Sequence, residues 1–410
     1  MTYSTGQSTA PRSGVLYPPA SVGVVGSGQL GRMFIQAAQR MGYRAGVLTA
    51  GDDDPAAQVA HWKVIGESDD LAALREFRAR AEAVTVEFEN VSAAGLRWLG
   101  RDRVVRPGWQ TAWICQNRMR EKRFLARHRV PHTPWCAVCS GDELDAAVRK
   151  LGLPLILKTS SSGYDGKGQI LVKTAQEAPS AWDSLGRPAA VAEALVDFAA
   201  ELSVVVARGA DGRAICYPVA MNRHQHHILD ATVAPAAVGP VVTQEAHRLA
   251  LAVAQAMGTV GVLTVEFFLI ADGTLLVNEI APRPHNSGHL TMDACVASQF
   301  EQQVRVLCGL PLGRPDLIMP AAMVNLLGDL WISGKREPQW EAALALDGGV
   351  SLHLYGKQLA VPGRKMGHLT VLDPDPDAAL QRALAAREAL VGGGVPHRIR
   401  IPAEAMARCV

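Results

Sequence analysis

The sequence predicts a protein of the α/β and α+β classes with more than one domain. Its 410 residues are enough for two or three domains of ordinary size. Over residues 21–48, a short apolar strand, a glycine-rich turn, a helical pattern and a second strand follow one another, which implies a βαβ unit and a parallel sheet. Two β-rich runs within 262–280 flank Asp272-Gly273, a pair that is typical of a tight hairpin.

We expect four segments along the chain. Residues 1–20 are polar, contain proline and glycine and lack a hydrophobic signal core, so we interpret them as a disordered tail. Residues 21–117 contain the βαβ unit and form an N-terminal α/β domain. Residues 118–312 begin with a helical segment, continue with several strands and form a middle domain. Residues 313–410 form a smaller α+β C-terminal domain.

The composition limits the kinds of partner. With 41 basic and 39 acidic residues the formal net charge is +2, which disfavours nucleic acid. No stretch approaches about 18 consecutive apolar residues, so no membrane span is expected. Seven cysteines without framework spacing fit a reducing compartment, and we expect a cytoplasmic protein. The pair Cys136 and Cys139 is interpreted as two partly buried thiols, with zinc or redox use as the alternative.

Two glutamates of the predicted hairpin indicate a metal site. If the loop consists of Asp272 and Gly273, then Glu266 and Glu279 are equidistant from its centre and face one another. Their Cβ atoms would lie about 5 Å apart on one face, where like charges repel. A divalent cation would relieve this repulsion, and Mg²⁺ on two carboxylates is typical of a site for nucleotide phosphates. The alternative is a register slip that turns one carboxylate to solvent.

Two glycine-rich segments predict contacts with phosphate. The first, residues 26–31, follows a strand and opens a helix, so its amides and the positive helix end favour a phosphate. No clear acidic residue for a ribose follows the second strand, which favours a phosphate monoester over a dinucleotide. The second segment, residues 159–168, joins two strands between Lys158 and Lys167 and is typical of a flap over a nucleotide. A solvated surface turn is the alternative for it.

The densest polar cluster lies just beyond Glu279. Arg283, His285 and Asn286 are presented by a proline-rich backbone and suit a small anion such as bicarbonate or a carboxylate. The spacing of His285 and His289 also allows zinc, although the neighbouring prolines disfavour the helix that this would need.

Several of these segments together match one family pattern. They are 26–33, 85–90, 116–118 with Lys122, 163–169, 278–289, 298–301, and 355–357 with 362–369. Between about residue 21 and about residue 370 the chain resembles the N5-carboxyaminoimidazole ribonucleotide synthetase family, whose members are ATP-grasp enzymes of purine biosynthesis. The segments around 285–289 and 362–369 are the most specific part of the resemblance.

The resemblance implies an ATP-grasp architecture and a carbon–nitrogen ligase. Such an enzyme uses ATP and bicarbonate to carboxylate the exocyclic amine of 5-aminoimidazole ribonucleotide. The products are N5-carboxyaminoimidazole ribonucleotide, ADP and phosphate, and the reaction passes through carboxyphosphate. The resemblance also implies ATP and Mg²⁺ as cofactors and a homodimer.

The resemblance assigns roles to residues in four groups. ATP would be held by Arg118, Lys158, Ser162, Gly163, Tyr164, Asp165, Gly166, Lys167, Gly168, Glu193, Ala194, Leu195, Val196, Glu201, His224, Asn278 and Glu279. Mg²⁺ would be held by Glu266 and Glu279, and bicarbonate by Arg283, His285 and Asn286. The ribonucleotide would contact Gln29, Leu30, Glu87, Tyr164, Asp165, Lys167, Lys357 and Arg364. Catalysis would involve Lys158, Tyr164, Asp165, Lys167, Arg283, His285 and Asn286.

Two other functions stay open at this point. A formate-dependent glycinamide ribonucleotide transformylase shares the ATP-grasp plan and the acyl-phosphate chemistry. A nucleotide-binding regulator would bind ATP without turnover.

Overall fold

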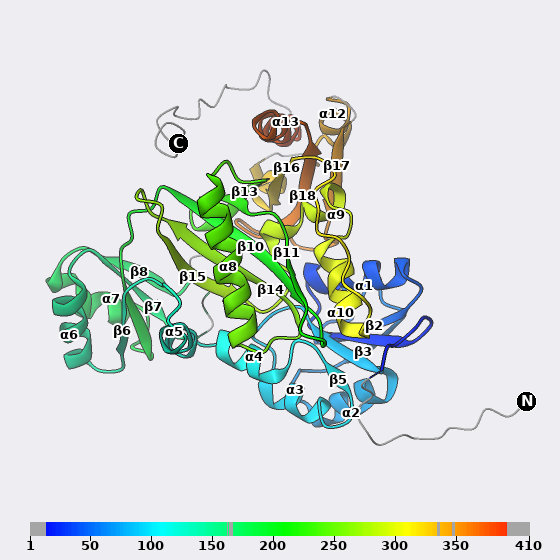
Figure 1. Cartoon of the computed structure of the whole chain (residues 1–410), viewed down its shortest axis with the longest axis horizontal. Helices are drawn as coiled ribbons and strands as arrows, with labels where there is room; N and C mark the ends of the chain where they lie inside the picture. Colours follow the sequence, from blue (N-terminus) through cyan, green and yellow to red (C-terminus); the bar gives the residue numbers. More distant parts are fainter. Residues whose placement is uncertain (1–13, 162, 164–166, 334–336, 347–348, 392–410) are drawn as a thin grey trace, which may run out of the picture.

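The computed structural model contains one parallel and two antiparallel sheets, and it describes residues 14–161, 163, 167–333, 337–346 and 349–391. Figure 1 shows the parallel sheet at the lower right, the larger antiparallel sheet in the centre and at the top, and the smaller one at the left.

The first region is built on a five-stranded parallel sheet in the order β3-β2-β1-β4-β5. Its elements are β1 Ser21–Val25, α1 Gln29–Arg40, β2 Arg44–Thr49, β3 Trp62–Ile65, α2 Leu71–Arg80, β4 Ala83–Val86, α3 Ala93–Leu99, β5 Val104–Val105 and α4 Trp109–Cys115. The predicted βαβ unit is therefore confirmed as β1, α1 and β2. The strands β1, β2 and β4 are almost wholly buried, as expected for parallel strands that are covered on both faces.

The prediction of a disordered tail over residues 1–20 is wrong for residues 14–20. Leu16 is buried, its N–H donates to the carbonyl of Cys308 at 2.8 Å, and its carbonyl accepts from the Tyr43 hydroxyl at 2.7 Å. The short run Val15-Leu16-Tyr17 between a glycine and two prolines gives no periodic signal, so the packing partner of Leu16 is visible only in the fold. Residues 1–13 lie outside the described residues.

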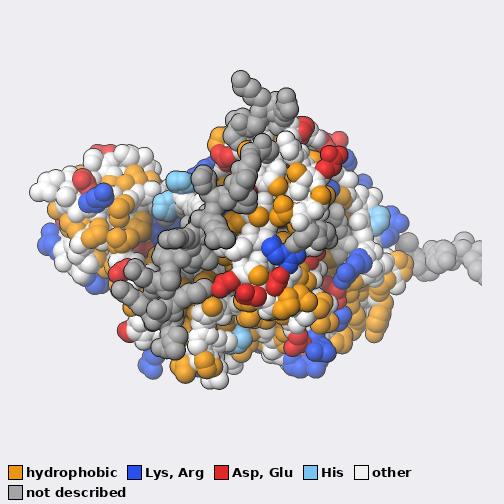
Figure 2. All heavy atoms as spheres, turned by 90° about the horizontal axis from the view of Figure 1, so that it is seen from above, with side chains coloured by type: hydrophobic (Ala, Val, Ile, Leu, Met, Phe, Trp, Pro, Cys, Tyr) orange, Lys and Arg blue, Asp and Glu red, His pale blue; other side chains and the backbone are white. Residues whose placement is uncertain are grey.

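The second region is a lobe with a four-stranded antiparallel sheet in the order β6-β9-β7-β8. Its elements are α5 Arg118–Arg127, β6 Trp135–Val138, α6 Gly141–Leu151, β7 Leu155–Thr159, β8 Gln169–Val172, η1 Ala175–Glu177, α7 Ala178–Ser184 and β9 Ala190–Ala194. The glycine-rich loop joins β7 to β8, so the predicted strand–loop–strand arrangement is confirmed. The helices α6 and α7 pack against one face of the sheet, and this lobe stands apart at the left in both Figure 1 and Figure 2.

The third sheet has nine antiparallel strands in the order β15-β14-β10-β12-β13-β16-β18-β17, with β11 paired to β10. Its strands are β10 Ala200–Arg208, β11 Ala214–Cys216, β12 Ala220–Gln225, β13 Ile228–Ala234, β14 Gly261–Leu269, β15 Leu275–Ala281, β16 Ala321–Leu327, β17 Val350–Leu354 and β18 Lys365–Leu372. The helical segments around it are α8 Pro240–Ala256, η2 Asn286–Gly288, α9 Thr291–Ala294, α10 Gln299–Cys308, α11 Asp329–Ser333, α12 Trp340–Leu344 and α13 Pro376–Ala389. Because β16 pairs with β13, the strands beyond the expected boundary at residue 312 continue the sheet of the middle region.

The hairpin of β14 and β15 has a loop of three residues, so the predicted two-residue loop is wrong. Ile270 and Thr274 are joined by a backbone hydrogen bond of 2.9 Å, which leaves residues 271–273 as the loop. Gly273 has φ of +89°, the left-handed conformation that closes a three-residue hairpin.

A β-bulge in β15 compensates for the longer loop. Phe267 pairs with Val277 whereas Glu266 pairs with Glu279, so Asn278 is the extra residue of the bulge. The register therefore shifts once at the loop and once back at the bulge. The predicted pairing of Glu266 with Glu279 is confirmed, although the loop length from which it followed was wrong.

The surface carries charges of both signs. In Figure 2, basic and acidic side chains are intermixed on the visible face, in agreement with the formal net charge of +2. Among the described helices, none has the length and hydropathy needed to span a bilayer.

Candidate active site

A buried ion-pair cluster lies where the four-stranded sheet of the lobe meets α5. Lys158, at the end of β7, lies 2.6 Å from Glu193 Oε2, and Lys122, on α5, lies 3.1 Å from Glu193 Oε1. Lys122 also donates to the carbonyl of Asn278 at 3.1 Å, which links α5 to the bulge of β15. Burial alone would raise the pKa of Glu193, but the two ammonium groups outweigh it and lower this pKa to about 2. Both lysines therefore face an ionised carboxylate.

Arg118 connects this cluster to the hairpin. It is the first residue of α5, whose N-cap Asn117 accepts from the N–H of Arg120 at 3.1 Å. The Arg118 guanidinium lies 3.3 Å from Glu279 Oε2 and donates to the carbonyl of Gly163 at 3.3 Å. Its position therefore ties the described end of the glycine-rich loop to the carboxylates of the hairpin.

Three carboxylates gather at the hairpin. Glu266 and Glu279 face each other, and Glu121 on α5 accepts from the N–H of Ile280 at 3.2 Å. Burial, with the Glu279 charge as the next cause, raises the pKa of Glu266 to about 7 and that of Glu121 to about 8. The raised pKa of Glu266 reflects in part the repulsion that was predicted between the facing glutamates. Two oxygen-bearing side chains that repel each other fit a divalent cation such as Mg²⁺.

A hydrogen-bond chain orients His285 toward Glu266. Ser203 on β10 donates to Ser287 at 2.8 Å, and Ser287 Oγ lies 2.9 Å from His285 Nδ1. Because Nδ1 also accepts from the Ser287 N–H at 3.3 Å, the ring proton is on Nε2, which lies 3.2 Å from Glu266 Oε1. Burial, reinforced by the charge of Arg283, holds the pKa of His285 well below its usual value. The imidazole is therefore neutral and donates to Glu266.

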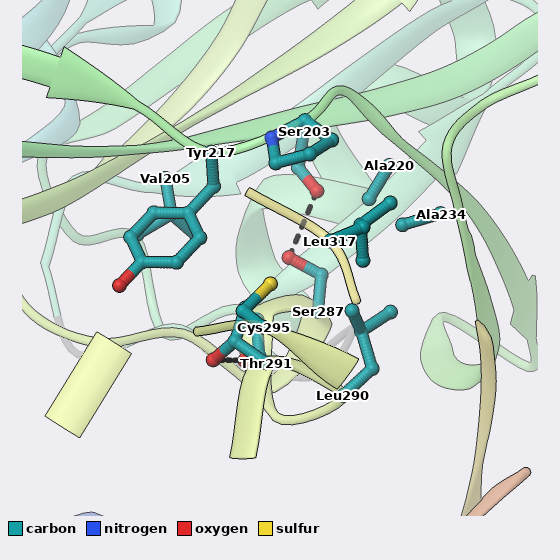
Figure 3. Close-up of a pocket in the computed structure, with 12 residues that line it drawn as sticks. Ser203, Val205, Tyr217, Ala220, Ala234, Ser287, Leu290, Thr291, Cys295 and Leu317 are labelled. Atoms are coloured by element: carbon teal, nitrogen blue, oxygen red, sulfur yellow. Dashed lines mark hydrogen bonds between the residues drawn. The ribbon is translucent and has the colours of Figure 1, made fainter. Parts of the chain in front are cut away.

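Figure 3 shows the small pocket behind this chain, with the Ser203–Ser287 bond at its wall. Its other labelled lining residues include Val205, Leu290 and Leu317, which makes it mainly apolar. Such a lining does not suit a polyphosphate.

The two other residues expected at bicarbonate have partners on neighbouring elements. Arg283 forms a two-pronged ion pair with Glu89, with contacts of 2.6 and 3.3 Å. Burial alone would raise the pKa of Glu89, but Arg283 lowers it below its usual value. Asn286 is buried, and its amide exchanges two hydrogen bonds of 3.1 and 2.7 Å with Asn325 on β16. Arg283 thus contacts the end of the parallel sheet, and Asn286 contacts the C-terminal strands.

Glu201 and His224, expected to contact nucleotide, lie together on adjacent strands. The Nδ1 atom of His224 on β12 lies 2.6 Å from Glu201 Oε2 on β10. Burial lowers the pKa of His224, but the hydrogen bond to Glu201 outweighs this and raises it above its usual value. The expected segment 194–196 continues from β9, where Glu193 joins the lysine cluster, and Leu195 is exposed.

The first glycine-rich turn binds a carboxylate of the protein itself. Glu87, which follows β4, accepts from the N–H of Gly28 at 2.5 Å and of Gly31 at 2.9 Å. It thereby caps α1, which has no cap from its own Gly28. A Cβ at Gly28 would come within 2.9 Å of the Glu87 carboxylate, so a larger residue here would displace the side chain that caps α1. The expected phosphate at these two amides is therefore replaced by Glu87, and Gln29 and Leu30 supply the other amides of the helix end.

The C-terminal residues expected at the ribonucleotide lie near the same turn. Lys357 donates to the carbonyl of Lys365 at 2.7 Å, and its charge acts on the Glu87 carboxylate. The neighbouring Gly356 carbonyl accepts from Gln58 at 2.7 Å, which anchors this segment to the first region. Arg364 is exposed and donates to the carbonyl of Leu359 at 3.0 Å.

Part of the glycine-rich loop falls outside the described residues, namely Ser162, Tyr164, Asp165 and Gly166. Lys167 is exposed. Gly168 has φ of +73° and would, with a Cβ, meet Thr159 Oγ1 at 2.6 Å, so the return of the loop into β8 needs glycine.

Three functional candidates were not assigned by the sequence reasoning. They are Lys122 and Glu121, both buried on α5, and Glu89, the partner of Arg283. Lys122 stands one helical turn after Arg118, a spacing that could have identified it. Glu89 stands two residues after Glu87, just past the end of a strand, where side chains of a parallel sheet often form a site. No local signal distinguishes Glu121 from an exposed helix residue.

Three family models match the chain, one in each of three successive segments. Residues 20–116 match the ribonucleotide synthetase preATP-grasp domain, residues 123–300 the ATP-grasp domain, and residues 321–382 the phosphoribosylaminoimidazole carboxylase C-terminal domain. The N5-carboxyaminoimidazole ribonucleotide synthase of Bacillus subtilis is 40% identical over 367 residues, which cover 90% of this chain and 95% of that protein.

Solved structures agree with this match. The N5-carboxyaminoimidazole synthetase of Staphylococcus aureus complexed with ADP has a TM-score of 0.85 at 35% identity and covers 93% of this chain and 100% of its own. The Aspergillus clavatus enzyme in complex with ADP and 5-aminoimidazole ribonucleotide has a TM-score of 0.83 at 30% identity, covering 92% and 99%. Fold, site and full-length similarity lead to one conclusion: the chain belongs to the N5-carboxyaminoimidazole ribonucleotide synthase family.

Proposed function

We propose that the chain catalyses the ATP-dependent carboxylation of 5-aminoimidazole ribonucleotide with bicarbonate, a step of purine biosynthesis. The products are N5-carboxyaminoimidazole ribonucleotide, ADP and phosphate. The observation that carries the proposal is the facing pair Glu266–Glu279, which lies between the lysine cluster and His285. The relatives of the chain are named for this activity.

The nucleotide would lie between the lobe and the large sheet. Lys158, Arg118 and the glycine-rich loop would contact its phosphates, because they bring positive charge and backbone amides to one place. Glu201 and His224 would accept and donate hydrogen bonds at its ribose or base, since both are polar and only partly buried. The segment 194–196 would contact the base.

Glu266 and Glu279 would hold Mg²⁺, with Asn278 beside them on the bulge. When bound, the ion would neutralise the phosphates and help to orient the γ-phosphoryl group. The protein's own contribution is to place the two carboxylates opposite each other and to keep His285 neutral beside Glu266.

Bicarbonate would lie next to Arg283, His285 and Asn286. Arg283 supplies a fixed positive charge, and Glu89 orients its guanidinium. Asn325 orients the Asn286 amide in the same way. The poor electrophile bicarbonate would be activated by phosphorylation to carboxyphosphate, so its oxygen must lie in line with the γ-phosphoryl group.

The ribonucleotide would lie at the end of α1. The amides of Gln29 and Leu30 would face its phosphate at the positive helix end, with Lys357 and Arg364 as counter-charges. Glu87, held at the same turn, would then lie beside the aminoimidazole. Tyr164 and Asp165 lie outside the described residues, and their expected roles stay predictions.

The test is ADP formation by the purified protein with ATP, Mg²⁺, bicarbonate and 5-aminoimidazole ribonucleotide, each omitted in turn. Glu279→Gln should abolish turnover, because it leaves one carboxylate for the ion. Glu245→Gln, which removes a surface ion pair with Arg248, is the matched control and should keep full activity.

The outcomes separate the possible functions. ADP release only with glycinamide ribonucleotide and formate would show the transformylase instead. Tight ATP binding with no ADP under saturating substrates would show a regulator. We also propose a homodimer, the commonest assembly of soluble proteins, which sedimentation equilibrium would test.

A further inference from the structure

A cluster of histidines lies outside the residues assigned to the reaction. Asp293 on α9, His353 on β17 and His368 on β18 each offer one ligand atom, and these atoms all lie within 4.8 Å of one another. His289, at the end of η2, packs against the same group with its ring centroid 5.0 Å from that of His368.

We propose that Asp293, His353 and His368 form a binding site for a transition-metal ion of the Zn²⁺ class, separate from the Mg²⁺ site. Imidazole nitrogens with one carboxylate oxygen are a usual donor set for Zn²⁺. The proposal does not depend on the reaction that the enzyme catalyses.

The strongest support is a buried nitrogen that lacks a partner. His368 is fully buried, and its Nδ1 lies 2.9 Å from the Tyr355 hydroxyl. Its Nε2 has no hydrogen-bond partner among the described residues, which is costly for a buried polar atom. If Nδ1 donates to Tyr355, Nε2 carries the free lone pair that a metal needs. Tyr355 then plays the orienting part that metal-binding histidines usually receive from a neighbour.

The other two ligands already form a pair into which an ion can insert. His353 Nε2 lies 2.9 Å from Asp293 Oδ2, a hydrogen bond whose proton a metal would replace while the ring takes the other tautomer. The side chains of His353 and Asp293 are 25% and 19% exposed, which gives the ion a route from solvent. The charge of Lys365 acts on the neighbouring His289, so a cation here has a positive charge nearby. The Asp293 carboxylate supplies the negative charge that offsets it.

One ring must turn for all three ligands to bind. The rings of His353 and His368 stack with centroids 4.5 Å apart and 15° between their planes. In this arrangement their nitrogen lone pairs do not point to one common position. The torsion of an imidazole about its Cβ–Cγ bond is broad, and the partly exposed His353 is the ring that can rotate.

The experiment is a Zn²⁺ titration of tag-free, chelator-treated protein by calorimetry, in excess Mg²⁺ to fill the carboxylate site. One Zn²⁺ per chain is expected for the unaltered protein and for His128→Ala, which removes an exposed histidine just after α5. Asp293→Asn and His353→Ala should each weaken binding by tenfold or more. Co²⁺ in place of Zn²⁺ should give visible absorption typical of nitrogen ligands.

Two results would overturn the proposal: no uptake by the unaltered protein, or the same uptake by His353→Ala. A thermal melt guards against misfolding, because Zn²⁺ should raise the melting temperature of the unaltered protein and not that of the variants. If His353→Ala does not fold, Asp293→Asn decides, since its amide oxygen can still accept the hydrogen bond from His353.

Discussion

Two groups of buried charged side chains meet at Arg118. In one group the positive charges outnumber the carboxylates, and in the other the carboxylates outnumber the positive charges. On one side, Glu193 stands between Lys122 and Lys158, and its pKa is lowered to about 2. On the other side, Glu266 and Glu121 stand near Glu279, and their pKa values are raised to about 7 and about 8. Burial acts in the same direction on all of these carboxyls, so the difference comes from their neighbours.

The comparison separates a cluster whose carboxylate charge is balanced within the fold from one whose carboxylate charges are not. The lysine cluster is complete within the fold, since its carboxylate already has two cations. The carboxylate cluster has excess negative charge that Arg118 offsets only in part. A fold that keeps such a group gains from it only when a cation is bound. This imbalance, more than the identity of the residues, marks the ligand site.

The largest expected effect is on the complete cluster. Glu193→Gln would leave Lys122 and Lys158 buried beside each other without their carboxylate. Breaking a buried ion pair in this way costs about 3–5 kcal/mol of unfolding free energy. Urea unfolding would measure the loss, and Glu245→Gln serves as the surface control. A loss under about 1 kcal/mol would show that the cluster is not a structural ion pair.

Arg118, which links the two groups, should matter next. Arg118→Ala removes a charged hydrogen-bonding partner of Glu279 and of the Gly163 carbonyl. A lost charge-assisted interaction of about 1.5–3 kcal/mol corresponds to a rise of roughly ten- to a hundredfold in the KM for ATP. Steady-state kinetics with ATP as the varied substrate would measure it. An unchanged KM for ATP would place the nucleotide away from Arg118.

The pH dependence should distinguish the clusters by sign. A folded carboxyl with a raised pKa binds more protons than the unfolded chain, so Glu266 should make the metal-free protein less stable as pH rises from about 4.5 to about 7. Glu193 has a lowered pKa, so its contribution is lost only as pH falls from about 4.5 toward 2. Melting temperatures across this range, with and without Mg²⁺, would show both limbs. Glu266→Gln should reduce the limb above pH 4.5 to the part that Glu121 contributes, and it should remove the effect of Mg²⁺.

The sequence predicted much of the fold, because βαβ order and strand–loop–strand patterns are local. It also predicted the pairing of Glu266 with Glu279, but the correct pairing came from two opposite shifts, at the loop and at Asn278. Neither the three-residue loop nor the bulge has a signal that fixes it in one sequence. Lys122, one partner of Glu193, and Glu89, the partner of Arg283, were not assigned, because they come from α5 and from the end of the parallel sheet and only tertiary packing brings them to the site.

Glu121→Gln should have the smallest effect at acid pH and sharpen the comparison most. Glutamine keeps the shape and the oxygen that accepts from the N–H of Ile280. Burial raises the pKa of Glu121 to about 8, so between about pH 4.5 and pH 8 the unfolded chain is ionised at this position while the folded carboxyl is mostly neutral. The glutamine variant should therefore match the unaltered protein in stability near pH 4 and become the more stable of the two as pH rises toward 8.

Above pH 8 the stability difference should level off, because Glu121 is then ionised in the folded protein as well as in the unfolded chain. In the folded protein, ionised Glu121 repels Glu279 when no metal is present. The Mg²⁺ affinity of the glutamine variant should fall at pH 9 and stay unchanged at pH 7, because only the ionised third carboxylate attracts the ion. Calorimetric titration with Mg²⁺ at both pH values would measure this difference. Equal weakening at pH 7 would mean that Glu121 is already charged there, and that Arg118 and Lys122 balance the hairpin as fully as the lysines balance Glu193.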